Sequence, residues 1–298
     1  MPSPVELSIF RTLAYFDYFK YPLTSFEIWK WLLEPGQATS LAQVIDALET
    51  SAWVKAKVFT YQGFYGLGPV DDWVADRHLR FLDASRKYHK VSKAIKLYRH
   101  LPGVEGVAVC NSLAWYQTKD TSDIDLFVIS EPGQVWSVRM LTTAPAILTR
   151  QRPGESQTDP VCLSFFCAAS AMNLESLKIG PSDPYLAYWS YSLVPVHDRS
   201  GWLANFRASN EWLKTVLPNA YEVRRAHRFT HRKGWRLPGL RALEKFAKRL
   251  QLKRFPKRIH AMMNVDTRVV VNDNILKFHD EDGRAEIALS LQDKLSRV

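Results

Sequence analysis

The chain is predicted to fold in the α+β class, because helical and strand-like patterns occupy different stretches of its 298 residues. The first 70 residues are mostly helical and end in a short hairpin pattern. A strand, a turn, a short helix and a second strand follow in residues 104–129. From residue 181 onward the pattern is mostly helical and strongly basic. We therefore expect an N-terminal module over 1–70, a connector helix over 71–101, a mixed sheet with flanking helices over 102–180, and a basic helical region over 181–298.

The N-terminal stretch reads as three helices and a hairpin. Apolar residues at helical spacing predict a first helix over 5–19. The capping boxes Thr24–Glu27 and Ser40–Gln43 open two more helices. Alternating residues in 53–61 and 63–67 then predict a hairpin. Elements in this order resemble a winged helix-turn-helix domain.

The third of these helices has the wrong charge for reading DNA. It exposes Gln43, Asp46 and Glu49 and carries no Lys or Arg between Ser40 and Ser51. Neutralisation of backbone phosphates supplies most of the affinity of a groove-binding helix. We therefore expect this module to pack or to contact protein, in preference to DNA.

The overall charge favours an anionic partner, since the formal net charge is +10. Three cysteines without a CxxC pair are typical of reduced thiols. The N-terminus has no basic region followed by an apolar one, and apolar stretches are shorter than a membrane span. A cytoplasmic location without membrane attachment is the resulting expectation.

The basic residues are concentrated in 224–258, where 14 positions are Lys or Arg and Glu244 is the only acid. Leu240, Leu243, Phe246 and Leu250 recur there at helical spacing, which predicts a basic amphipathic helix. Such a helix suits RNA or another nucleic acid, a solvated surface, or peripheral contact with an anionic membrane. A nucleic-acid partner is our first expectation and membrane contact the weakest.

The central strands carry the most informative residues. The turn at Asn111-Ser112 separates a strand over 104–109 from a helix over 113–117, and the next strand opens with Asp123-Ile124-Asp125. Side chains alternate along a strand, so Asp123 and Asp125 share one face. Two neighbouring carboxylates repel each other unless a cation offsets them. Hard oxygen ligands suit Mg²⁺, whose shell is often completed by substrate phosphates.

This strand–turn–helix–strand unit resembles the nucleotidyltransferase superfamily, the polymerase-beta-like fold, over residues 104–166. The resemblance extends to poorly characterised bacterial members with a winged-helix-like module. It implies a nucleoside triphosphate substrate and Mg²⁺ or Mn²⁺ held by Asp123 and Asp125, which are also the catalytic residues. Asn111 and Ser112 would bind the nucleotide with Ser122, and Lys119 or Arg139 would neutralise phosphate.

The superfamily's third carboxylate is expected in the next strand, Val161–Phe166, which contains no acid. Ser164 is the polar residue at that position, and Asp159 lies just before the strand. Asp280 is a more distant substitute.

Two functions follow from the resemblance. The first is Mg²⁺-dependent transfer of a nucleoside monophosphate to an RNA end, a protein or a small molecule. The second is a catalytically degenerate protein that binds nucleic acid or regulates. The missing acid leaves both open.

Overall fold

The computed structural model describes residues 1–156, 158–222 and 241–298. Its centre is a six-stranded mixed sheet with strand order β7-β4-β5-β6-β9-β8. The strands are β4 (Val104–Val109), β5 (Ile124–Ser130), β6 (Val161–Ala168), β7 (Val194–Asp198), β8 (Val269–Val271) and β9 (Ile275–Phe278). Strands β5 and β6 run parallel, and the other neighbouring pairs are antiparallel. The predicted mixed sheet with flanking helices is therefore confirmed.

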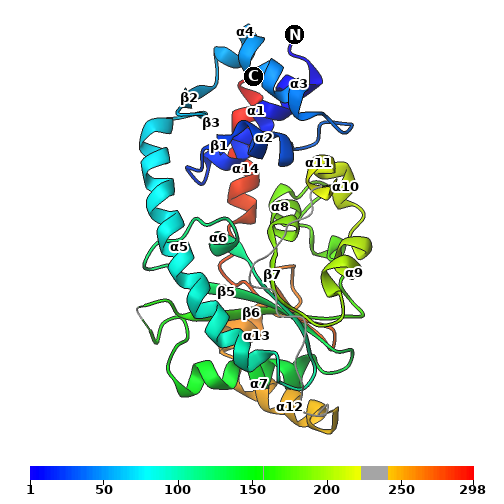
Figure 1. Cartoon of the computed structure of the whole chain (residues 1–298). Helices are drawn as coiled ribbons and strands as arrows, with labels where there is room; N and C mark the ends of the chain where they lie inside the picture. Colours follow the sequence, from blue (N-terminus) through cyan, green and yellow to red (C-terminus); the bar gives the residue numbers. More distant parts are fainter. Residues whose placement is uncertain (157, 223–240) are drawn as a thin grey trace.

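Helices cover both faces of this sheet (Figure 1). Ile124, Leu126 and Val128 of β5 pack in one core with α7 (Val135–Leu148) and α12 (Glu244–Arg254). Phe127 and Ile129 pack in another core with α8 (Pro184–Ser192) and α9 (Trp202–Ser209). The two cores confirm the alternation predicted for β5.

The N-terminal module contains four helices and a small sheet. The helices are α1 (Pro4–Asp17), α2 (Ser25–Lys30), α3 (Leu41–Thr50) and α4 (Ala52–Lys55). The small sheet has the order β1 (Leu23–Thr24), β3 (Phe64–Gly66) and β2 (Phe59–Tyr61). Both predicted capping boxes form. The hairpin is shorter than predicted, because Ser51 Oγ accepts a hydrogen bond from Val54 N and starts α4 there.

The core of the N-terminal module is continuous with segments from the other end of the chain. Ile9 and Leu13 share a cluster with Tyr188 of α8 and with Ile287 and Leu291 of α14. Helix α14 (Arg284–Ser296) lies beside α1 in Figure 1. The module is thus packed against the rest of the protein.

The long helix predicted after residue 70 is α5 (Val70–Tyr98), and it contains a fully buried lysine. Lys87 Nζ donates to the carbonyl of Ser122 at 2.8 Å and to that of Lys119. It also pairs with Asp83 at 3.1 Å and Asp159 at 3.7 Å. Since Asp123 follows Ser122 and Asp159 precedes β6, one buried ammonium fixes both loops that enter the central strands.

The C-terminal half differs from its predicted helices. Within the region expected to be mostly helical, residues 202–222 form three short helices: α9, α10 (Leu213–Val216) and α11 (Pro218–Glu222). The break between α9 and α10 falls at Asn210, whose amide donates to the carbonyls of Met172 and Phe206 and so leaves the helical pattern.

The face of the basic helix that is buried differs from the apolar face that the sequence predicted. Ala247 and Gln251 face the core, and Phe246 is 58% exposed. Residues 224–240 of the predicted basic region, Leu240 included, lie outside the described residues. The chain continues through α13 (Lys257–Met262) into β8 and β9.

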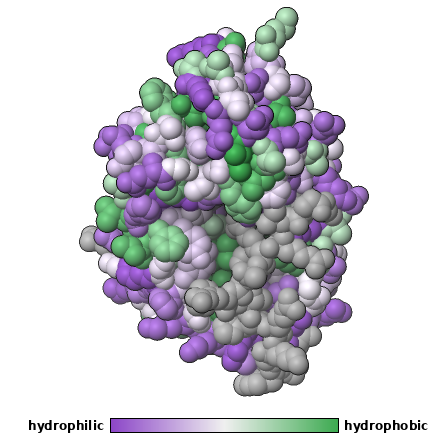
Figure 2. All heavy atoms as spheres, turned by 45° about the horizontal axis from the view of Figure 1, so that its top comes forward, coloured by the Kyte–Doolittle hydropathy of each residue, from purple (hydrophilic) through white to green (hydrophobic). Residues whose placement is uncertain are grey.

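The surface is mixed in character. Figure 2 shows hydrophilic and apolar residues interspersed on one face, with the described apolar ones in small groups. Over residues 1–156, 158–222 and 241–298, no helix combines the length and apolarity that crossing a bilayer requires.

Replacing the buried lysine tests its clamping role. Lys87→Met removes the charge and should lower the free energy of unfolding by about 2–4 kcal/mol, because Asp83 and Asp159 lose a buried partner. Lys93→Met, at an exposed site on the same helix, should change it by less than about 0.5 kcal/mol. Denaturant unfolding measures both, and equal effects of the two variants would contradict the clamp.

Candidate functional site

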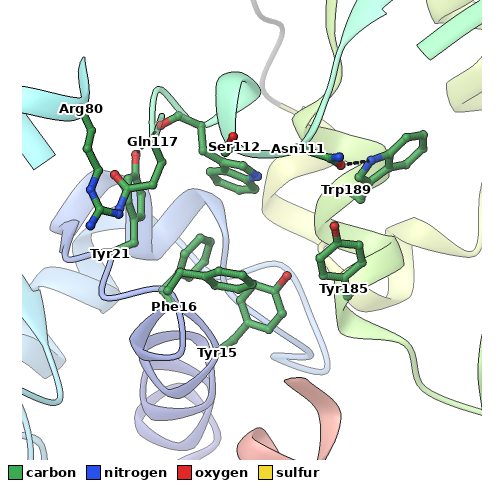
Figure 3. A pocket seen from close by; sticks show the side chains of 11 residues that line it. Tyr15, Phe16, Tyr21, Arg80, Asn111, Ser112, Gln117, Tyr185 and Trp189 are labelled. Atoms are coloured by element: carbon green, nitrogen blue, oxygen red, sulfur yellow. Dashed lines mark hydrogen bonds between the residues drawn. The ribbon is translucent and has the colours of Figure 1, made fainter. Parts of the chain in front are cut away.

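The turn after β4 places a polar amide beside β5. Asn111 has φ +53°, in the left-handed region that Asn tolerates well. Helix α6 (Asn111–Ala114) starts at this residue, two positions before the predicted start. Asn111 Oδ1 accepts a hydrogen bond from Trp189 Nε1 at 2.9 Å (Figure 3). The side chain is therefore held between α8 and the start of β5.

The two predicted carboxylates line one cavity of about 440 Å³. Asp123 precedes β5 and Asp125 lies within it. Helix α8 and the segment 277–284 contribute the opposite walls. The cavity also contains the polar or charged side chains Asn111, Cys162, Ser164, Tyr185, Lys277, His279, Asp280, Glu281, Asp282 and Arg284.

Burial makes ionisation of this pair costly. It raises the pKa of Asp125 to about 6, and the charge of Asp123 adds to the rise, while hydrogen bonds from Asn111 and Cys162 oppose it. Burial also raises the pKa of Asp123, against the opposing charge of Lys87. Neither carboxylate forms an ion pair within the described part of the chain. In the described part of the chain, only the more distant charge of Lys87 is found to favour ionisation of Asp123.

A divalent cation fits this pair. Carboxylate oxygens are the ligands that Mg²⁺ and Mn²⁺ prefer. Among the described residues, no group of three or more His, Cys, Asp or Glu side chains is arranged to hold a metal. Asp123 and Asp125 would therefore supply the protein ligands, and phosphate and water oxygens the remainder, as is usual for Mg²⁺.

The neighbouring strand β6 has a serine where a third acid was expected, and a histidine from the segment after β9 lies beside that serine. Cys162 is opposite Asp125 in the β5–β6 register, and Ser164 lines the same cavity. Ser164 Oγ and His279 Nε2 are 3.2 Å apart. Burial lowers the pKa of His279 to about 3, so the imidazole is neutral at pH 7. His279 was not predicted as a site residue. The sequence hint was its position as the first of several polar residues directly after a strand.

The two candidate replacement acids have other partners. Asp159 is buried against Arg86 and Lys87, in the clamp on α5. Burial opposes its ionisation, but the hydrogen bond from Arg86 and the charges around it lower its pKa overall. It therefore holds a loop and does not serve the cavity. Asp280 does line the cavity, and it pairs with Arg258 at 3.2 Å.

Three other predicted nucleotide-binding residues lie outside the cavity. Ser122 Oγ accepts from Lys119 N at 2.9 Å, which closes the turn before Asp123. The Lys119 side chain is exposed. Arg139 packs against Phe278 on the α7 side of the sheet, with its guanidinium 4.6 Å from the ring centroid. Helical spacing alone did not reveal which face of the sheet α7 covers.

A second cavity, of about 220 Å³, adjoins the first. Ser112 lines this cavity, and Asn111 lines both. The two cavities also share Phe19, Tyr185 and Trp189. The two cavities therefore meet at these shared residues, of which Asn111, Tyr185 and Trp189 lie at one end of the second cavity in Figure 3.

Comparison with known proteins gives no relative: no family model matches the chain, and no curated protein or solved structure is significantly similar to it. The residues themselves have to carry the functional inference.

The buried charge predicts how stability depends on pH. Because the pKa of Asp125 is higher in the folded protein, the free energy of unfolding should fall as pH rises from about 4 through 6 without divalent cation. Asp125→Asn should stabilise the metal-free protein at pH 8 by about 1–2 kcal/mol and flatten this dependence. Denaturant titrations from pH 4 to 8 measure it; a destabilised variant with an unchanged pH profile would contradict the assignment.

Proposed function

We propose that this protein is an Mg²⁺-dependent nucleotidyltransferase that moves a nucleoside monophosphate from a nucleoside triphosphate to an acceptor hydroxyl. The observation that carries the proposal is the pair of Asp123 and Asp125, which forms no ion pair among the described residues, on a cavity wall next to the Asn111-Ser112 turn. Buried acids with raised pKa values in a cavity are typical of functional sites.

Each residue has a defined part in this proposal. Asp123 and Asp125 would hold the cation, which would supply neutralisation of phosphate charge and polarisation of the phosphorus–oxygen bonds. Asn111 holds the Asp125 carboxylate through its side-chain amide. The Ser112 hydroxyl lies on the wall of the adjoining cavity and would contact the part of the nucleotide that extends past Asn111.

The Ser164–His279 pair supplies the group that could take a proton from the acceptor hydroxyl. In nucleotidyl transfer the acceptor oxygen bonds to the α-phosphorus, pyrophosphate leaves with the electrons of the broken bond, and the acceptor loses a proton. The neutral His279 imidazole can take that proton, but a pKa of about 3 makes it a weak base. We therefore expect slow turnover.

The proposal is tested with labelled triphosphates. Wild-type protein, Mg²⁺ or Mn²⁺ and total RNA or protein should give acid-precipitable label from an α-labelled nucleotide. Asp123→Asn and Asp125→Asn should each lower the rate at least about a hundredfold. Asp46→Asn, at an exposed site on α3, is the matched control and should retain full activity. Equal transfer by all four proteins would refute the proposal.

A second candidate function rests on the basic surface formed by the turn Arg241–Leu243, α12 and the start of α13. Six exposed basic side chains there form no ion pair among the described residues: Arg241, Lys245, Arg249, Lys253, Arg254 and Lys257. Together with Ser164 at the third-acid position, they favour a degenerate protein that binds nucleic acid through this surface.

Salt dependence distinguishes this second function. The affinity for single-stranded RNA should fall steeply with salt, and Arg249→Ala/Lys253→Ala should reduce the log–log slope by about 2. Lys93→Ala/Lys96→Ala, which removes two exposed charges from α5, is the control and should leave the slope unchanged. Fluorescence anisotropy from 50 to 300 mM salt measures it. Salt-independent binding would exclude the function.

A further inference from the structure

The cavity beside Ser112 is built largely from aromatic side chains of the N-terminal module, the α6 segment and α8. Its walls come from α1 and the residues after it, from α6, and from α8. Seven of its lining residues are aromatic: Tyr15, Phe16, Phe19, Tyr21, Trp115, Tyr185 and Trp189. Figure 3 shows Tyr15 and Phe16 on one wall, with Tyr185 and Trp189 at the far end. Such walls favour a flat, apolar-faced group.

Two residues that line this cavity each carry a polar atom without a partner in the described part of the chain. Arg80 Nε and Gln117 Oε1 are buried and form no hydrogen bond among the described residues. Both residues line the cavity, and Figure 3 shows them close together at the end opposite Trp189. One is a donor and the other an acceptor. An unsatisfied buried pair of this kind costs free energy until a ligand with the complementary edge satisfies it.

The cavity is unsuited to phosphate. The Arg80 guanidinium already pairs with Asp76, so the cavity presents no free positive charge from this residue. Phosphate would also lose its hydration against aromatic walls without compensation. A nucleobase meets both requirements, because it has aromatic faces and an edge that carries a hydrogen-bond acceptor next to a donor.

We infer that this cavity binds the base of the nucleotide whose phosphates lie at Asp125, with Arg80 and Gln117 as the base-reading residues. The inference rests on the proposed function for the position of the phosphates. The shared wall residues Asn111, Tyr185 and Trp189 connect the two cavities and give the ribose its path. The N-terminal module thereby supplies part of the nucleotide site.

Binding of three probes tests the inference. Isothermal titration would use the α,β-methylene analogues of ATP, GTP, CTP and UTP with Mg²⁺, inorganic tripolyphosphate with Mg²⁺, and the four nucleosides without metal. At least one nucleotide should bind more than about tenfold tighter than tripolyphosphate, and its nucleoside should bind detectably. Gln117→Leu should weaken that nucleotide about tenfold and leave tripolyphosphate unchanged. Arg80→Met is the second variant, and Lys93→Met, at an exposed site on the same helix, is its control.

The outcomes separate the two proposals. If nucleotides and tripolyphosphate bind equally and neither Arg80→Met nor Gln117→Leu changes this, the phosphate site stands and the base site is wrong. A second outcome is that nucleosides bind, that Gln117→Leu lowers their affinity, and that nucleotides with Mg²⁺ bind no tighter than nucleosides. The base site then stands and the proposed transfer is wrong. If no probe binds, both are wrong.

Discussion

The buried ammonium of Lys87 is the interaction on which the arrangement of the site depends. It joins α5 to the loop before β5 and, through Asp159, to the loop before β6. A buried lysine is costly unless it is fully paired and hydrogen-bonded, and here it has two carboxylates and two carbonyls. The loop that carries Asp123 therefore cannot move independently of the long helix.

This rigidity allows the protein to keep two carboxylates close together. Asp123 and Asp125 lie on one face of β5 with raised pKa values and without an ion pair among the described residues. The folding energy of the two cores and the clamp offsets their repulsion. The pair therefore lowers the stability of the folded protein, and binding of the proposed cation and phosphates would restore that stability.

The sequence pattern predicted the strand β5 and the Asn111 turn of the candidate site. The other residues of the site are brought there by contacts between distant segments. Alternation along β5 and the left-handed tolerance of Asn111 follow from backbone geometry, so both were visible in the sequence. His279 reaches Ser164 across 115 positions, and Arg80 meets Gln117 only because α5 runs past α6. Arg139 was misplaced because helical periodicity does not reveal which face of a sheet a helix covers. Asp159 was misplaced because its partner, Lys87, lies on another element.

The most direct measurement is a crystal structure with Mn²⁺ and a non-transferable nucleoside triphosphate analogue, with the metal located by anomalous scattering. The proposals require a manganese peak coordinated by Asp123 and Asp125, phosphate oxygens at that metal beside Asn111, and the base between the aromatic walls near Arg80 and Gln117. A nucleotide bound elsewhere, or no metal at the carboxylate pair under saturating Mn²⁺, would contradict them.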